Sequence, residues 1–452
     1  MSVPVDDAIV PQRLVIVLPT TGEFDSRTYR IARSCVARGH DVTILARSAP
    51  GLPDEERDPA GYRIVRAQVE AIDGLPFPAL WRRLLRRPAG SDGAAAGEAD
   101  TEPGLAVAGR STRSSGRNLR SRIRAAGRAV VRLTAIVLTV RAQVRASRGL
   151  DPAADLYHGM AYMGIPVAIS LAARRKVPVV YDARDIYVDA GNIARLPRPI
   201  RRFLGRLERG WARRADRVIT VNQPYAEVMA SRWDLPLPLI VLNCSFRYEP
   251  GEPRSRRIHE QLGLDRKAAV VLYQGGFSRD RGIEQLIEAI RLVPDAVLVL
   301  MGYGRLRAEL EVVAADPALD GRVRILPAVP PAELLDWISA ADIVAMPIQP
   351  TTLNHRLTTP NKLFEAMAAG VPVVASDLPG MASIVRDTGA GLLVDPTDPT
   401  VIAAAITSLV TDPVRRAELA GKALAAAHAT YNWETQANAL LAEYSRLTGR
   451  QW

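Results

Sequence analysis

The sequence predicts an α/β protein built from two doubly wound, Rossmann-like domains that face a central cleft. Short apolar segments of strand length alternate with helical segments in two series, one before residue 246 and one after residue 257. Such alternation is typical of a parallel sheet covered by helices. The length agrees, because 452 residues with 48% apolar composition are too many for one hydrophobic core and enough for two.

The N-terminal domain is expected to span residues 1–246. It opens with an apolar run at 13–18, a polar turn at 20–25 and a helical segment at 26–38 that Gly39 ends. After a long interruption, short apolar segments resume beyond residue 150. We expect the strands of this domain at residues 13–18, 41–46, 155–158, 177–181 and 217–221.

The interruption contains a predicted disordered insertion and a predicted basic helix. Residues 88–116 are rich in Ala, Gly, Ser and Asp without apolar periodicity. Apolar residues at spacings of three and four then predict an amphipathic helix over residues 117–148, beside an arginine stripe that runs from Arg117 to Arg132. This helix either lies on an anionic membrane surface or packs its second half on the N-terminal sheet, and both interpretations stay open.

The second series predicts a C-terminal domain over residues 247–430. Its strands are expected at residues 269–273, 296–301, 323–326, 343–346 and 371–375, with helical segments between them. The last segment, residues 431–452, contains an amphipathic helix that we expect to pack across the domain junction.

Composition excludes several classes of protein. The first residues include Asp6 and Asp7 in place of a basic export signal, and the apolar run at 133–140 falls far short of the roughly 20 residues of a membrane span. Two cysteines make no disulfide framework. Residues 81–148 hold fifteen arginines and four acidic residues, which equals the whole net charge of +11. This confinement indicates a local membrane contact and no nucleic-acid partner, in a cytoplasmic protein.

The most informative segment is TTPNKLFEAMAAGVPVVAS, residues 358–376. Thr359 and Pro360 are typical of a helix start, and the free backbone N–H groups of Asn361 and Lys362 create an anion site suited to a diphosphate. Glu365 shares their face of the helix and can accept hydrogen bonds from both hydroxyls of a ribose.

Two glycine-containing turns add a phosphate site. In YQGGFSRDRG, residues 273–282, Gly275 and Gly276 allow a ligand to approach the backbone, and Arg281 supplies positive charge. In MGYGRLR, residues 301–307, Gly302 and Gly304 follow a strand, but Arg307 stands where a dinucleotide fingerprint has its third glycine.

These motifs, in this order, resemble those of retaining GT-B glycosyltransferases of the large family 4 type. The resemblance covers nearly the whole chain and implies that Glu365 binds the ribose of the donor nucleotide. It implies a diphosphate bound by Arg281 and Lys362, and a nucleobase read by the backbone near Val329. The remaining donor-binding residues it implies are Gly275, Gly276, Gly302, Gly304, Pro360, Asn361 and Leu363. The sequence departs from the family at Leu357, where many members have a glutamate, and at Gly276, which replaces an arginine.

The N-terminal domain offers candidate acceptor residues at strand ends. Gly22 and Asp25 lie in the loop TTGEFD, His158 ends the strand in DLYHGM, and Arg184 and Asp185 lie in YDARDI, where similar proteins often have a histidine. The chain has no DxD, HExxH or cysteine cluster, so we expect a reaction without a metal or other cofactor.

The predicted function is transfer of a hexose or N-acetylhexosamine from a nucleotide-diphosphate sugar, with UDP-sugar favoured over GDP-sugar. The expected acceptor is a saccharide or a lipid-linked acceptor in cell-envelope or exopolysaccharide synthesis, at the inner face of the cell membrane. Three alternatives stay open: a sugar-nucleotide epimerase of the same fold, a nicotinamide-dependent oxidoreductase, and an inactive membrane-associated scaffold.

Overall fold

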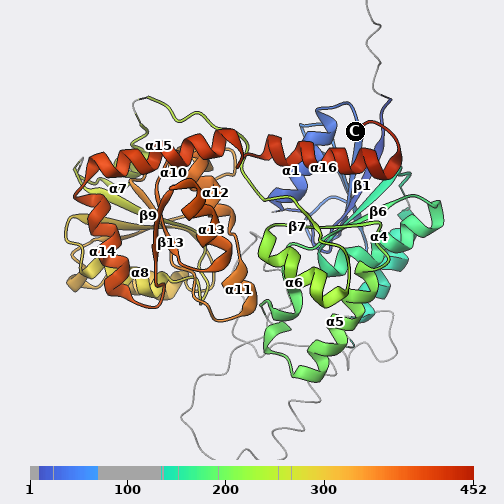
Figure 1. Cartoon of the computed structure of the whole chain (residues 1–452), viewed down its shortest axis with the longest axis horizontal. Helices are drawn as coiled ribbons and strands as arrows, with labels where there is room; N and C mark the ends of the chain where they lie inside the picture. Colours follow the sequence, from blue (N-terminus) through green and yellow to red (C-terminus); the bar gives the residue numbers. More distant parts are fainter. Residues whose placement is uncertain are drawn as a thin grey trace, which may run out of the picture. The chain divides into compact units, whose positions relative to one another are not determined.

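The computed structural model describes residues 10–23, 25–69, 134, 137–150, 152–191, 193–252, 254–265 and 267–452. The chain forms two compact α/β units (Figure 1). Unit 1 comprises Met1–Thr220, Ala226–Ile240 and Ala439–Trp452, and unit 2 comprises Val221–Tyr225 and Val241–Asn438. The predicted class of two Rossmann-like domains is confirmed.

Within the described residues, unit 1 contains an eight-stranded sheet in the order β3-β4-β2-β1-β5-β6-β7-β8. All neighbouring strands are parallel except β3 and β4. The strands are β1 Arg13–Val17, β2 Asp41–Arg47, β3 Glu55–Arg57, β4 Arg63–Ala67, β5 Leu156–Met160, β6 Val179–Asp182, β7 Arg217–Thr220 and β8 Leu239–Ile240. All five predicted strands are present. The three that the sequence did not predict, β3, β4 and β8, lie toward the sheet edges, and β3 and β8 are too short to carry a strand pattern.

Helices cover the sheet of unit 1, with α1 packed on β2 and α4 packed on β1, β5 and β6. The carboxylate of Asp25 caps the first of these helices by accepting a hydrogen bond of 3.0 Å from the Thr28 N–H. The helical elements are α1 Ser26–Val36, α4 Ala161–Arg175, η1 Tyr187–Asp189, η2 Ile193–Arg195, α5 Arg198–Ala212 and α6 Gln223–Trp233.

Unit 2 contains a six-stranded parallel sheet in the order β11-β10-β9-β12-β13-β14, in the part of the chain that the structure describes. The strands are β9 Ala269–Gly276, β10 Ala296–Tyr303, β11 Val323–Leu326, β12 Ile343–Met346, β13 Val373–Ser376 and β14 Gly391–Val394. The five predicted strands are confirmed, and β14 was missed.

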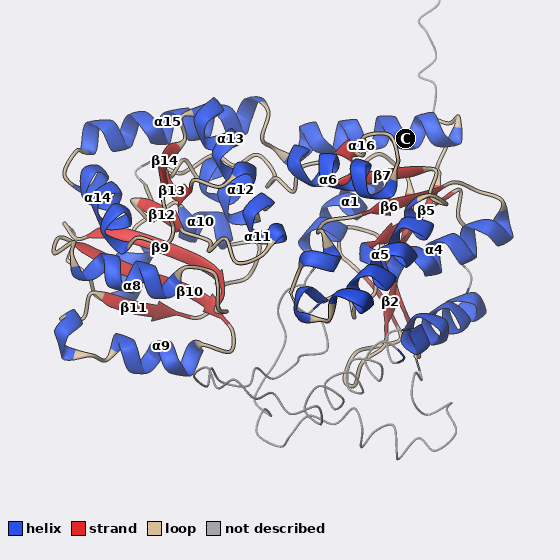
Figure 2. Ribbon diagram, turned by 60° about the horizontal axis from the view of Figure 1, so that its bottom comes forward, coloured by secondary structure: helices blue, strands red, loops and turns tan. Residues whose placement is uncertain are grey.

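Two apolar clusters bury the two faces of this second sheet, beneath the helices that cover it in Figure 2. Side chains alternate along each strand, so that Val299 of β10 belongs to one cluster and Leu298 to the other. One face packs on α8 Ile283–Arg291, α9 Arg307–Ala314 and α14 Pro399–Val410, and the other on α10 Leu334–Ile338, α12 Asn361–Ala368 and α13 Pro379–Thr388. The remaining helical elements are α7 Arg257–Leu262, η3 Pro317–Leu319, α11 Leu353–Leu357 and α15 Pro413–Ala429.

The predicted C-terminal helix is α16, Trp433–Thr448. Its first residues, to Asn438, belong to unit 2, and its later residues belong to unit 1. In unit 1 the hydroxyl of Tyr444 lies 2.5 Å from His158 Nδ1, and both side chains are fully buried. The end of the chain therefore completes the core of the N-terminal sheet.

The predicted insertion at 88–116 and the arginine stripe from Arg117 to Arg132 lie outside the described residues. Residues 137–150 are helical, as expected. The Gln143 side-chain amide donates a 2.8 Å hydrogen bond to the carbonyl of Leu18 at the end of β1, and Ser147 is fully buried. The second half of the predicted basic helix therefore packs on the N-terminal sheet. No helix among the described residues is long and apolar enough to cross a membrane.

Unit 1 buries a carboxyl group, Glu208 of α5, which is 3% exposed. It accepts a 2.8 Å hydrogen bond from the Tyr181 hydroxyl. Burial raises the pKa of Glu208 to about 7, although the Tyr181 hydrogen bond and the charge of Arg232 act in the opposite direction, and Asp185 adds to the rise. The folded state therefore binds a proton at Glu208 over a pH range in which the unfolded state has lost it.

This shift predicts a pH-dependent stability. The pKa of Glu208 in the folded state lies above the ordinary value of 4.5. The stability that protonated Glu208 gives the folded state is therefore fully present below pH 4.5 and is lost as the pH rises toward 7. We expect Glu208→Gln to become more stable relative to wild type by up to roughly 3 kcal/mol between pH 4.5 and 7. Urea unfolding at both pH values measures this. The exposed Glu227→Gln on α6 is the control, and an equal effect of Glu208→Gln at both pH values contradicts the assignment.

Candidate functional site

The sheet of unit 2 changes direction between β9 and β12. From β9 the chain proceeds outward through β10 and β11, and from β12 it proceeds the other way through β13 and β14. The loops that leave these two adjacent strands contact each other, since the Gln349 N–H donates a 2.9 Å hydrogen bond to the Asp280 carbonyl. In open α/β sheets, ligands bind outside the carboxyl ends of the strands at such a switch point.

Helix α12 begins at this edge of unit 2. Its N-cap is Pro360, which makes no side-chain capping hydrogen bond. The expected capping residue, Thr359, is engaged elsewhere: its hydroxyl accepts from the Asn222 amide at 2.9 Å and donates to the Gly380 carbonyl at 3.2 Å. The Thr359 side chain therefore does not cap the helix, and the binding of an anion at its first turn stays a prediction. Leu363, which was also predicted to bind the donor, has a fully buried side chain, and its N–H donates to the Pro360 carbonyl.

Asn361, Lys362 and Glu365 share the half-buried face of α12, while the other residues of the helix are buried. The Lys362 amine lies 3.9 Å from the centre of the Tyr273 ring. A methyl group built on Gly275 would lie 3.5 Å from the same amine. The helix start and the end of β9 thus place the lysine next to the predicted glycine turn.

Two polar side chains hold this face in place. The Gln274 amide donates a 2.6 Å hydrogen bond to Glu365 Oε2, and the Asn243 amide donates a 2.7 Å hydrogen bond to Asn361 Oδ1. Sequence reasoning missed both partners. Gln274 precedes the predicted glycine turn on a buried strand, so a polar residue at that position was the available signal.

The glycines of the two turns lie side by side, because Gly302 pairs with Gly275 and Tyr303 with Gly276 in the β9–β10 register. Gly302 has a φ of +154°, and a methyl group there would lie 2.0 Å from the Gly275 carbonyl oxygen. Gly304 likewise packs on Phe277, with its built methyl group 2.4 Å from the Phe277 carbonyl oxygen. Gly302 and Gly304 are therefore required for backbone packing, independently of any ligand.

The other two predicted donor residues of unit 2 lie at strand ends as well. Arg281 is half-buried in the loop between β9 and α8, and its charge acts on Tyr273, whose pKa is raised by burial. Val329 follows β11 and packs part of its side chain against the apolar cluster that contains Leu326. Their contacts with a donor stay predictions.

Of the acceptor residues predicted in unit 1, Arg184 and Asp25 contact each other, whereas His158 lies in the core. Arg184 forms an ion pair with Asp25, with distances of 2.9 and 2.8 Å to its two carboxylate oxygens, and Asp185 is half-buried beside it in sequence. Gly22 is buried, where a methyl group would contact Ala46 and Ile64. The arginine in YDARDI is therefore held by the loop after β1.

His158 differs from its prediction as a ligand-facing residue, because it is fully buried. Its Nε2 lies 3.3 Å from Asp182 Oδ2, which also accepts a 2.6 Å hydrogen bond from Arg27 Nε. Burial raises the pKa of Asp182, but Arg27 and His158 outweigh it and hold that pKa well below its usual range. This ion network belongs to the core of unit 1. Among the described residues, no group of His, Cys, Asp and Glu could hold a metal ion.

The close packing of Gly302 on the Gly275 carbonyl oxygen can be tested by substitution. We expect Gly302→Ala to destabilise unit 2 by about 1–3 kcal/mol or more, because the added methyl group meets a carbonyl oxygen and the backbone angle is strained. The matched control is Gly276→Ala on the neighbouring strand, where nothing lies within 4 Å of the built methyl group. Denaturant unfolding compares the two variants. Equal stability of both would disprove the close approach of the two turns.

Comparison with known proteins agrees with this geometry. Residues 268–412 match the family described as glycosyl transferases group 1, and residues 24–245 match the glycosyl transferase 4-like domain. A D-inositol 3-phosphate glycosyltransferase of Xylanimonas cellulosilytica is 35% identical over 199 residues, which cover 43% of this chain and 46% of the relative. The chain thus spans about half the length of the first curated relatives it matches.

Solved structures extend the likeness in fold to nearly the whole chain. Sucrose-phosphate synthase from Thermosynechococcus elongatus has a TM-score of 0.69 at 21% identity, covering 97% of this chain and 99% of that one. Anabaena Alr3699/HepE, solved in complex with UDP, has a TM-score of 0.63 at 16% identity, covering 97% and 100%. The chain therefore belongs to the glycosyltransferases, an enzyme family, and joins a glycosyl transferase 4-like domain to a group 1 domain in the GT-B fold.

Proposed function

We propose that this protein transfers a hexose or N-acetylhexosamine from a nucleotide-diphosphate sugar, with UDP-sugar favoured over GDP-sugar. The observation that carries the proposal is the start of α12, where an uncapped helix terminus, the Lys362 amine and the Glu365 carboxylate meet the glycine turn of β9. The UDP named in the Anabaena Alr3699/HepE structure supports a uridine nucleotide. Retention of anomeric configuration is proposed from the family 4 resemblance.

The chemistry proposed for this site is electrostatic stabilisation of the leaving diphosphate. The N-terminus of α12 carries partial positive charge, and Lys362 and Arg281 add full charges, where negative charge develops as the glycosidic bond breaks. Glu365, held by the Gln274 amide at 2.6 Å, is oriented to accept hydrogen bonds from ribose hydroxyls. No cofactor or metal ion takes part in this proposal.

The acceptor is proposed to be a saccharide or a lipid-linked saccharide in cell-envelope or exopolysaccharide synthesis, at the inner face of the cell membrane. The basic segment at 81–148 supports a contact with anionic lipid. The names of the curated relatives favour a second candidate acceptor, a phosphorylated polyol such as inositol 3-phosphate.

The donor site is tested by nucleotide-dependent thermal stability. We expect UDP to raise the melting temperature of wild type more than GDP, ADP or dTDP, because a ligand that binds only the folded state stabilises it. Glu365→Ala should abolish the shift and lower turnover by about 10²-fold or more, the order of effect of removing an oriented site group. Glu260→Ala, at an exposed position of α7, is the control. The proposal fails if no nucleotide shifts wild type, or if Glu365→Ala responds like the control.

The membrane contact is tested by flotation with liposomes that contain anionic lipid. Deleting residues 88–132 removes the arginine stripe from Arg117 to Arg132, so we expect wild type to float with anionic liposomes and the deletion variant to remain in the dense fraction. Neutral liposomes, which should bind neither protein, are the control. Undiminished flotation of the deletion variant would rule out this segment as the membrane contact.

A further inference from the structure

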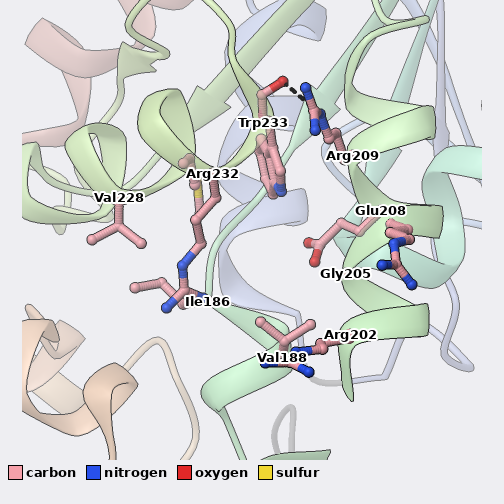
Figure 3. Close-up of a pocket in the computed structure, with 11 residues that line it drawn as sticks. Ile186, Val188, Arg202, Gly205, Glu208, Arg209, Val228, Arg232 and Trp233 are labelled. Atoms are coloured by element: carbon pink, nitrogen blue, oxygen red, sulfur yellow. Dashed lines mark hydrogen bonds between the residues drawn. The ribbon is translucent and has the colours of Figure 1, made fainter. Parts of the chain in front are cut away.

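Unit 1 contains a pocket that none of the predicted site residues explains. It lies between η1, α5 and α6 and has a volume of about 310 Å³, at the lower end of the range of small-molecule sites (Figure 3). Apolar side chains from all three elements line it, including Ile186, Val188, Val228, Met229 and Trp233. The pocket therefore offers an apolar contact surface to a ligand.

A carboxyl group stands in this apolar lining. Glu208 is 3% exposed and points into the pocket (Figure 3), with one of its oxygens bonded to the Tyr181 hydroxyl at 2.8 Å. Because burial raises its pKa to about 7, a substantial fraction of Glu208 is protonated near neutral pH and can donate a hydrogen bond. Glu208 therefore opposes an anionic ligand less than an ordinary glutamate does.

Four arginines line the same pocket, and two of them are already engaged. Arg232 forms a 2.7 Å ion pair with Asp189, and Arg209 donates to the Trp233 carbonyl at 3.3 Å and lies 3.5 Å from Asp234. Arg202 and Arg206 differ from them. They stand one turn apart on α5, both exposed, and neither side chain has a hydrogen bond or ion pair with another described residue.

We propose that this pocket binds an amphiphile in which a phosphate monoester is joined to an apolar chain. Two guanidinium groups at i and i+4 suit the oxygens of one phosphate, which arginine binds in a fixed fork geometry. The chain of the ligand fills the space beside Met229 and Trp233. Equating this amphiphile with the lipid-linked acceptor rests on the proposed function, whereas its binding to the pocket does not.

The ligand class is tested by calorimetric titration of the full chain with octyl phosphate. Octanol, inorganic phosphate and inositol 3-phosphate are titrated in parallel, so that the apolar chain and the phosphate are each removed in turn. We expect octyl phosphate to bind at least about tenfold more tightly than the other three, since it alone uses both parts of the pocket. Equal affinity for inorganic phosphate or inositol 3-phosphate, equal affinity for octanol, or no binding of octyl phosphate overturns the proposal.

Variants locate the binding in the pocket. Gly205 lines it, and a methyl group there would make an ordinary 3.6 Å contact with Val188, so the longer side chain of Gly205→Met enters the cavity. Gly210→Met on the same helix is the control, because nothing lies within 4 Å of that position. We expect Gly205→Met to lose octyl phosphate binding and Gly210→Met to keep it.

The surface variant Arg202→Gln/Arg206→Gln tests the phosphate contact without altering the core, and should weaken octyl phosphate binding about tenfold or more. Unchanged binding in this variant, or equal binding by the two glycine variants, contradicts the assignment. The thermal shift by UDP is measured in every variant. If UDP still stabilises wild type while octyl phosphate does not bind, the pocket proposal fails and the proposed donor site stands.

Discussion

The parallel pairing of β9 with β12 is the constraint on which the candidate donor site depends. Parallel strands bring their carboxyl ends to one edge, and the chain leaves these two strands in opposite directions. The loop after β9 and the loop that leads to α12 therefore meet at a single place. Lys362 and Gly275 are 87 residues apart in sequence, yet this pairing puts the lysine amine beside the glycine.

The two units use buried polar groups in opposite ways. In unit 1, Arg27 and His158 both contact Asp182, and His158 also contacts Tyr444, so these polar groups face one another inside the core. In unit 2, the polar residues of α12 stay half-buried, and the Gln274 amide donates a hydrogen bond to Glu365. The first set of polar groups is enclosed in the core, whereas the second lies at the half-buried face that is proposed as the donor site.

Sequence reasoning predicted the sheets and the α12 segment because both are local patterns: apolar runs of strand length, and a proline-started helix with Lys362 and Glu365 on one face. It was wrong about His158, whose burial depends on Tyr444, 286 residues away. It missed Gln274 for a related reason, since only the folded sheet brings that amide to Glu365, 91 residues later. Long-range partners decide whether a polar strand residue faces ligand or core, and one sequence carries no signal of them.

Net charge per segment is a similarly incomplete guide to where anions bind. The chain outside residues 81–148 is close to neutral as a whole. Around helix α5, acidic residues pair with particular arginines, as Asp189 does with Arg201 and Arg232. Arg202 and Arg206 line an apolar pocket, and their side chains have no partner among the described residues. The net charge of the chain outside residues 81–148 is nevertheless close to zero. What attracts an anion is therefore the cation that folding leaves without a partner, and this depends on geometry that a charge count does not contain.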